Sequence, residues 1–340
     1  MMKRFTTALI ALAMVAIGAA GQALINGGGA TFPYPMYSKW FNEYKAKKGV
    51  AINYQSQGSG FGVQQITAGT IDFGASDYAL TDDQLKEFQS KRGMAVLEFP
   101  TVLGADVPAY NLKGVTAPLN FTGEALAGIF LGKITKWNDP ELVKANPGVN
   151  LPKTDIVVVH RSENSGTTFI WVDYLCKVSK EWEMKVGRGA GVNWPVGLAG
   201  KGNEAVAGQV EQTANSLGYI ELTYAIQNKI PYGKVKNADG EFVQASLASV
   251  TAAAAGAAKN MPDDFRVSIT NAPGKGVYPI SSFTWLLVPE KIADPAKKKA
   301  ITDFLTWMLK DGQTMTEALS FAQLPKEVVA KEVKAIAKIK

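Results

Sequence analysis

Three short segments of the 340-residue chain combine glycine, serine and threonine in a way that suits an oxyanion. They are Gly29–Phe32, Gly58–Gly60 and Ser165–Thr167, and Arg161 lies just before the third. Each segment follows an expected strand and opens an expected helix, so its backbone N–H groups are free and carry a partial positive charge. Hydroxyl groups add donors, and the Arg161 guanidinium matches two oxygens of a tetrahedral anion. Together these groups predict an anion site built mostly from neutral donors.

The same hydroxyl groups have a local alternative role. Serine and threonine are preferred at helix N-caps, where the side chain accepts a bond from a backbone N–H of its own helix. For any single segment, capping is the commoner role. Three such segments together with Arg161 favour an anion site over three separate caps.

Familiar nucleotide-binding loops do not occur in these segments. Gly58, Gly60 and Gly62 are spaced as GxGxG, whereas the dinucleotide fingerprint requires GxGxxG. A glycine follows Lys201 where a P-loop requires Ser or Thr, and Pro195 stands where its first glycine belongs. The sequence therefore argues against a nucleotide site.

Nucleophilic and metal chemistry have little support. One His and one Cys in the chain exclude a disulfide framework, Cys-built zinc sites and zinc enzymes with several imidazole ligands. His160 adjoins Arg161 on an expected strand and points to the opposite face, so it is poorly placed as a base for Ser165. Cys176, on the apolar face of an expected helix, is expected to pack as a small buried hydrophobe. We expect no catalytic residue, no metal and no cofactor.

Short strands alternate with helices along the chain, which is typical of an α/β fold. Apolar residues at three- and four-residue spacings predict a helix over 36–44, and Ile71–Phe73 is a predicted strand. Thr81–Gln84 fits a capping box at the start of a helix. The Gly-rich stretch 194–202 is a predicted loop, with Asn203 as the expected N-cap of the following helix.

Residues 1–23 have the features of a secretory signal peptide. Lys3 and Arg4 precede an apolar stretch over 8–17, and small residues follow, with cleavage after Ala20 or Ala23. The alternative, an N-terminal membrane anchor, needs a longer apolar run. No Cys lies near the cleavage zone, so lipid attachment is not expected. We expect an exported, unanchored periplasmic protein.

The formal charge of +6 invites a nucleic-acid interpretation that its distribution does not support. Two of the six charges belong to Lys3 and Arg4. The segment 291–340 supplies the other four, with ten Lys against six acidic residues on expected amphipathic helices. The remaining segment, 24–290, is neutral overall and has no basic stripe interleaved with aromatic residues. We expect no nucleic-acid partner.

Seven motifs occur in the order of one known family. They are INGGGATFPYPMYSKW, GSGFG, IDFGASD, FPTVLG, IFLGKITKWND, RSENSGTTF and WPVGLAGKGN. The chain closely resembles the periplasmic phosphate-binding proteins of high-affinity phosphate (Pst) ABC uptake systems over the mature chain to about Pro325. Its INGGGAT start also resembles the related DING phosphate-binding proteins.

The resemblance implies a two-domain periplasmic-binding-protein fold of type II, the Venus-flytrap arrangement, with a hinge of two crossover segments. We place domain I at 24–102 plus 280–340 and domain II at 103–279, with two similar aromatic-proline steps near these boundaries, Phe99-Pro100 and Tyr278-Pro279. The implied partners are inorganic phosphate and the membrane permease subunits and ATPase of an ABC transporter, and the implied state is a monomer.

By motif position the resemblance assigns phosphate contacts to all three segments and to one acidic residue. These residues are Thr31, Phe32 (through its backbone N–H), Ser59, Asp77, Arg161, Ser165, Gly166 and Thr167. Close relatives often have Asp where this chain has Glu163, and that carboxylate holds the arginine in place. Because Glu163 is one methylene longer, how it reaches Arg161 is left open.

An acidic residue in an anion site has a specific use. A carboxylate only accepts hydrogen bonds, and phosphate at neutral pH carries a proton to donate, whereas sulfate carries none. Asp77 is therefore expected to bind phosphate and to repel sulfate, a kind of recognition that can discriminate by about 10⁴ to 10⁵.

Three other functions remain open from the sequence. One is a secreted phosphatase or esterase that uses Ser165 or Thr31, although metal ligands and a well-placed base are missing. Another is a binding protein for a different tetrahedral oxyanion such as sulfate, molybdate or arsenate. The third is an extracellular adhesion or scaffold protein.

Overall fold

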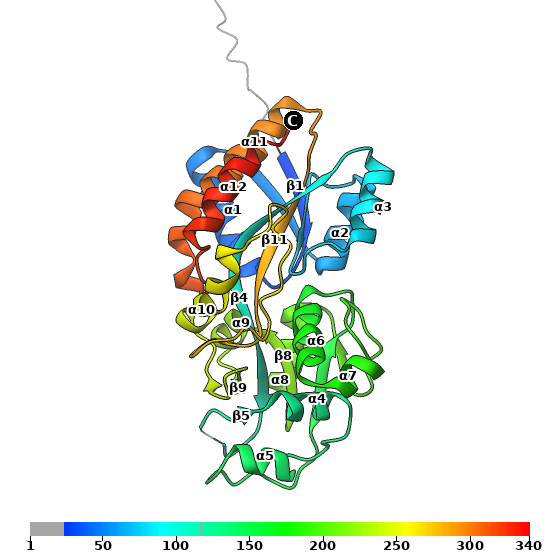
Figure 1. Ribbon diagram of the computed structural model, residues 1–340, viewed down its shortest axis with the longest axis vertical. Coiled ribbons are helices and arrows are strands. Elements are labelled where there is room, and N and C mark those ends of the chain that lie inside the picture. Colours follow the sequence, from blue (N-terminus) through cyan, green and yellow to red (C-terminus); the bar gives the residue numbers. More distant parts are fainter. Residues whose placement is uncertain (1–23, 116) are drawn as a thin grey trace, which may run out of the picture.

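The computed structural model describes residues 24–115 and 117–340, so the predicted signal peptide at 1–23 lies outside the described residues. The chain forms two lobes stacked along the longest axis of the molecule (Figure 1). One mixed sheet of eight strands, in the order β2-β1-β3-β11-β4-β8-β6-β7, runs through both lobes. Helices and parallel strands alternate as the sequence predicts, which confirms the α/β class.

The first lobe holds the N-terminal strands and helices. Its elements are β1 (Leu24–Gly29), α1 (Tyr34–Lys48), β2 (Ala51–Ser56), α2 (Ser59–Ala68), β3 (Phe73–Ser76) and α3 (Asp82–Arg92). Strand β1 pairs in parallel with β2 and β3, so the carboxyl ends of these strands meet at one edge. The apolar residues that predict a helix over 36–44 form the buried face of α1. Thr81 and Gln84 form the predicted capping box at the start of α3.

Two long strands connect the lobes. They are β4 (Val96–Asn111) and β11 (Ser281–Pro289). Nine of the first ten residues of β4 pair with β11, with an irregularity at Thr101, and its last six pair with β8 of the second lobe. The aromatic-proline step Phe99-Pro100 lies within β4, and Tyr278-Pro279 lies just before β11. The domain boundaries near 102 and 280 stay a prediction, although both fall on these connecting segments.

The second lobe holds the middle of the chain. Its elements are β5 (Asn120–Phe121), α4 (Gly123–Phe130), α5 (Pro140–Ala145), β6 (Val157–Arg161), α6 (Gly166–Val178), α7 (Lys180–Lys185), β7 (Leu198–Gly200), α8 (Gly202–Gln212), β8 (Ser216–Glu221), α9 (Leu222–Gln227), β9 (Lys234–Lys236) and β10 (Phe242–Val243). Strand β6 lies between β7 and β8 and is parallel to both. Its carboxyl end, at Arg161, faces the first lobe, because α6 begins where the two lobes meet (Figure 1).

The C-terminal part of the chain adds three helices. They are α10 (Leu247–Lys259), α11 (Pro295–Trp307) and α12 (Lys326–Ile336). In α11 the residues Ile301, Phe304 and Leu305 are buried, while Lys299 is exposed and Lys297 and Lys298 are half-buried. The lysine excess of this segment therefore decorates amphipathic helices, as the sequence predicts.

Three sequence predictions about local structure differ from what the structure shows. Asn203 is not an N-cap: α8 already begins at Gly202 after Lys201, and the Asn203 side chain bonds other elements instead. The predicted strand Ile71–Phe73 begins only at Phe73 and extends to Ser76. Within the predicted loop 194–202, the short strand β7 pairs with β6. In 24–115 and 117–340, no helix is both long and apolar enough to cross a membrane.

Candidate functional site

The three predicted segments meet where the two lobes face each other. The first two lie at the starts of α1 and α2 in the first lobe, and the third lies at the start of α6 in the second. The lobes touch directly here, because the Gly60 N–H donates to the Asn164 carbonyl at 2.9 Å. A cleft of about 740 Å³ opens beside this contact, and the Lys201 ammonium bonds the Gln57 side chain across it at 2.6 Å.

The first segment turns tightly from β1 into α1. Gly29 has a φ of +140°, and a Cβ there would lie 2.1 Å from the carbonyl oxygen of Ala75, so only glycine fits. The Ala30 N–H donates to the same carbonyl at 3.0 Å. This turn leaves Thr31 and Phe32 buried at the lobe boundary.

Asp77 follows β3 and is buried, with 1% of its surface exposed. Its carboxylate accepts bonds from Thr284 Oγ1 at 2.8 Å and from Ser59 Oγ at 3.2 Å. Burial raises the pKa of Asp77 to about 7, and the Thr284 bond, the Arg161 charge and the Ser59 bond each oppose that rise. The carboxyl group therefore has its pKa near neutral pH.

Arg161, at the end of β6, forms hydrogen bonds through both its guanidinium and its backbone N–H group. Its Nε donates to Glu163 Oε1 at 3.0 Å, its Nη2 also bonds that oxygen, and its Nη1 donates to Thr167 Oγ1 at 2.9 Å. Its backbone N–H donates to the Tyr219 hydroxyl at 3.1 Å. Glu163 Oε1 also accepts from the Gly202 N–H at 3.1 Å. The longer Glu163 side chain thus reaches the guanidinium and fixes its direction.

The first turn of helix α6 packs closely against the first lobe. A Cβ on Gly166 would lie 2.3 Å from Ser59 Oγ and 2.4 Å from Asp77 Oδ2. The N-terminus of α6, with its free N–H groups, therefore lies beside the Asp77 carboxylate of the first lobe. This close approach explains why residue 166 is a glycine.

The capping alternative holds for only one of the predicted hydroxyl groups. Ser165 is the N-cap of α6, and its Oγ accepts from the Thr168 N–H at 3.1 Å. Ser59 instead bonds Asp77, and neither α1 nor α2 has a side-chain cap. The other three hydroxyl groups, those of Thr31, Ser59 and Thr167, instead bond Asn203, Asp77 and Arg161 respectively.

The structure adds residues that the sequence did not single out as parts of the site. Asn203 bonds the hydroxyl groups of Thr31 and Thr167, and Thr284 bonds Asp77 from β11. Asn203 lies in one of the quoted motifs, WPVGLAGKGN, and was interpreted only as a helix cap. No sequence motif around Thr284 indicates a role in the site, because the residue comes from a strand that is distant in sequence.

Two buried acidic residues lie behind the site as direct cross-strand partners, Asp106 on β4 and Glu221 on β8. In the described part of the chain, both carboxylate oxygens of Asp106 and Oε1 of Glu221 lack a hydrogen-bond partner. Burial raises the pKa of each well above its ordinary value, and neighbouring carboxylates add to the rise. Both groups therefore favour their protonated form and add little negative charge behind the site.

His160 and Cys176 are structural, as predicted. The His160 ring stacks on Trp194 at 4.9 Å between centroids, and its Nδ1 bonds the Arg161 carbonyl. Burial lowers the pKa of His160. Cys176 is buried and free. Among residues 24–115 and 117–340, no group of three potential metal-ligating side chains comes together.

The chain is similar to known binding proteins over most of its length. Residues 15–311 match the PBP superfamily domain. The chain is 47% identical over 306 residues to the phosphate-binding protein PstS of Xylella fastidiosa strain Temecula1, covering 90% of this chain and 82% of that protein. It is 46% identical over 308 residues to the phosphate-binding protein PstS of Pasteurella multocida strain Pm70, covering 90% and 88%.

The fold also matches a solved structure of a high-affinity periplasmic phosphate-binding protein (PfluDING) bound with phosphate. The TM-score is 0.71 and the identity 23%, over 92% of this chain and 93% of that one. The two sequence relatives are named as binding proteins and not as enzymes. The chain therefore belongs to the PBP superfamily and, within it, to the family of the phosphate-binding protein PstS.

Proposed function

We propose that this protein captures inorganic phosphate between its two lobes and delivers it to the permease subunits and ATPase of a phosphate ABC importer. The observation that carries the proposal is a buried set of hydrogen-bond donors from both lobes, with the Arg161 guanidinium and the Asp77 carboxylate buried at the boundary between the lobes and close enough for the charge of Arg161 to lower the pKa of Asp77. The proposed ligands are Thr31, Phe32 (backbone N–H), Ser59, Asp77, Arg161, Ser165, Gly166 and Thr167.

The donors account for affinity. Oriented N–H groups at the starts of α1, α2 and α6 favour a negative charge, and Arg161 offers a charge-assisted bond whose direction Glu163 holds. Because the donors come from both lobes, an enclosed anion bridges them and stabilises the closed arrangement. Binding and closure are thus coupled.

Asp77 accounts for specificity. Its oxygens are acceptors when ionised, so they pair with a protonated phosphate oxygen and leave sulfate facing an unpaired buried charge. Arsenate shares the protonation and shape of phosphate and is expected to bind as well.

We further propose that the protein acts in the periplasm as an unanchored monomer, after removal of residues 1–23. Membership of a family of periplasmic binding proteins supports the compartment. The cleavage zone without cysteine supports the free form.

Calorimetric titration of phosphate-stripped protein tests the proposal. Phosphate and arsenate are expected to bind at one site per chain, and sulfate is expected to give no binding heat under the same conditions. Absence of phosphate binding by stripped, folded protein would overturn the function. Equal binding of sulfate would overturn the assignment of phosphate as the ligand.

A further inference from the structure

We infer that Asn203 is a positioning residue that turns the hydroxyl protons of Thr31 and Thr167 toward the bound anion. The inference rests on the proposed function, because it names a residue that prepares the phosphate site without touching the ligand. Asn203 lies on the first turn of α8 and is fully buried. Its side chain lies between the two halves of the site.

The orientation of the Asn203 amide is fixed by a backbone group. The Glu221 N–H donates to Asn203 Oδ1 at 2.9 Å. A backbone N–H can only donate, so the atom that it meets must be the carbonyl oxygen of the amide. The NH₂ group is therefore on the other side, where it faces the two threonines.

Both amide protons are used on threonine oxygens. Asn203 Nδ2 donates to Thr31 Oγ1 at 2.9 Å and to Thr167 Oγ1 at 3.0 Å. Thr31 Oγ1 also accepts from the Asn203 backbone N–H at 3.3 Å, and Thr167 Oγ1 accepts from Arg161 Nη1 at 2.9 Å. Each oxygen thus has two donors aimed at its two lone pairs.

A hydroxyl group with both lone pairs engaged has only its proton left to offer. Neither threonine donates that proton to another group within the described part of the chain. The proton is available to an acceptor, and an anion oxygen supplies one. Without Asn203, each hydroxyl could rotate and present a lone pair to the anion, which would repel it.

Asn203 also joins the lobes, since Thr31 belongs to the first lobe and Thr167 and Glu221 belong to the second. Its bonds to Thr31 require that the lobes be closed. The Thr31 hydroxyl is therefore oriented only in the closed state, whereas the Thr167 hydroxyl is oriented within the second lobe alone.

Two substitutions of Asn203 distinguish orientation of the hydroxyl groups from a purely structural packing role. Asn203→Ala removes the NH₂ group, and phosphate affinity is expected to fall about 10- to 100-fold. Asn203→Asp keeps the shape but replaces the donor with an acceptor, which turns both hydroxyl protons away from the site; a fall of about 1,000-fold is expected. Asn228→Ala, at an exposed asparagine of the same lobe, is the matched control and should bind like the wild type.

A role exerted through the hydroxyl groups predicts coupling. In a Thr167→Val or a Thr31→Val background, Asn203→Ala should raise the phosphate Kd by a smaller factor than in the wild type. Equal factors in all backgrounds, or an unchanged Kd in both Asn203 variants, would overturn the inference and leave the proposed function intact. A wild-type protein that binds no phosphate would overturn the proposed function itself. Thermal melting of each variant confirms that the protein is folded, and the same-sized Asn203→Asp serves if the alanine variant does not fold.

Discussion

At the scale of single residues, the site combines many neutral donors with one carboxylate whose pKa is raised. Asp77 is buried beside the first turns of α2 and α6, and its pKa is raised to about 7, chiefly by burial. A carboxyl group that titrates there changes from acceptor to donor within the ordinary range of pH. Discrimination between phosphate and sulfate should therefore depend on pH.

Sulfate binding to the wild type is expected to strengthen about tenfold as the pH falls from about 8 to about 5, and to level off below about pH 6. The reason is that only protonated Asp77 can donate to sulfate, and the raised pKa of about 7 sets the midpoint of the change. Competition of sulfate with a fluorescent reporter of closure measures the effect. Asp77→Asn, which donates at every pH, is the control and should show no such change. A wild-type sulfate affinity that does not vary with pH would contradict the role of Asp77.

The sequence indicates the candidate site residues that lie in contiguous segments. Arg161 ends β6, Asp77 directly follows β3, Ser59 opens α2 and Thr31 lies in the turn between β1 and α1, so their meeting follows from the rule that ligands bind beyond the carboxyl ends of strands. Thr284 comes from a strand more than 200 residues farther along the chain than Asp77 and was not predictable from local pattern.

At the scale of elements, the start of α6 controls how closely the lobes approach. A side chain at position 166 would occupy the space of Ser59 Oγ and Asp77 Oδ2. The helix N-terminus can therefore reach the anion only if residue 166 has no Cβ.

Gly166→Ala is expected to weaken phosphate binding about 10- to 100-fold, because the added methyl group keeps the lobes apart. Gly256→Ala is the matched control: this helical glycine of α10 has open space around its Cβ position, and its substitution should leave binding unchanged. Titration calorimetry of both variants measures the difference. Unchanged affinity in Gly166→Ala would show that α6 does not have to make this contact.

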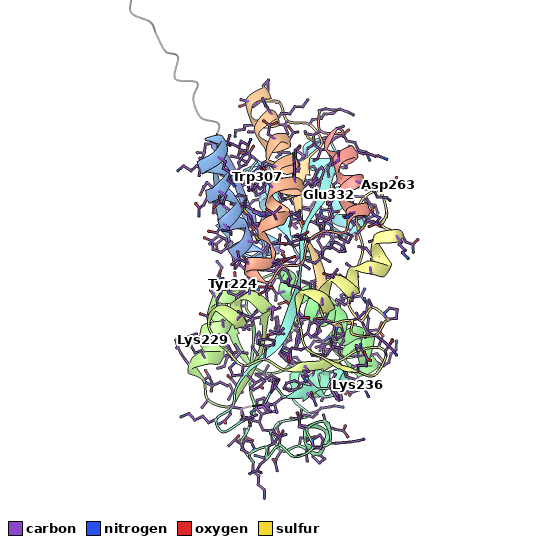
Figure 2. The ribbon with its side chains drawn as sticks, turned by 90° about the vertical axis from the view of Figure 1, so that its left-hand side faces the viewer. Tyr224, Lys229, Lys236, Asp263, Trp307 and Glu332 are labelled. Atoms are coloured by element: carbon purple, nitrogen blue, oxygen red, sulfur yellow. The ribbon has the colours of Figure 1, made fainter. Side chains whose placement is uncertain are left out.

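Helix α12 carries a buried acid that is unrelated to the site. Glu332 faces the interior of the first lobe (Figure 2), and neither carboxylate oxygen has a partner among the described residues. Burial raises the pKa of Glu332 well above its ordinary value. Stability from a carboxyl group with a raised pKa is complete below its unfolded pKa of about 4.3 and is lost as the pH rises toward the folded value.

Glu332→Gln is therefore expected to raise the free energy of unfolding by about 1–3 kcal/mol at about pH 8, and by less at about pH 5. Urea titration at the two pH values measures this difference. Glu327→Gln, at an exposed position of the same helix, should change stability by less than about 0.5 kcal/mol at either pH. An equal gain at both pH values would mean that Glu332 does not hold its proton through burial.

Element boundaries were predictable where a cap or an apolar repeat marks them. Gly49, in the left-handed conformation, ends α1, and Thr81 opens α3 through the predicted capping box. Asn203 misled the sequence interpretation because asparagine is a preferred cap, yet here tertiary bonds to Thr31 and Thr167 use the side chain. Strand β7 was missed because pairing with β6 determines it, and pairing is not visible locally.

At the scale of the whole molecule, the lobes enclose the site almost completely. Thr31, Asp77, Arg161 and Thr167 are each at most 2% exposed. Tyr224, which lies at the level where the lobes meet (Figure 2), donates to the Thr31 carbonyl at 2.6 Å and adds to the closure. A ligand can reach these residues only if the lobes separate, and β4 and β11 are the strands that would bend.

Small-angle scattering should therefore give a larger radius of gyration for stripped protein than for protein with excess phosphate. The physical reason is that the anion bridges donors of both lobes and shifts the population toward the closed form. Excess sulfate at about pH 8 is the control and should leave the radius at its stripped value, because Asp77 is then largely ionised. A radius that is the same with and without phosphate would argue against opening of the lobes.

Net charge contributes little to the proposed anion site, since 24–290 is neutral overall and the proposed preference for phosphate comes from individual groups such as Asp77.

The most direct test is the ratio of phosphate affinity to sulfate affinity at about pH 8 for the wild type and for Asp77→Asn. The Asp77→Asn ratio should be about tenfold or more below the wild-type ratio, because the amide can donate to sulfate whereas Asp77, with a pKa of about 7, is largely ionised at about pH 8. An Asp77→Asn protein that discriminates against sulfate as well as the wild type does would contradict the central claim.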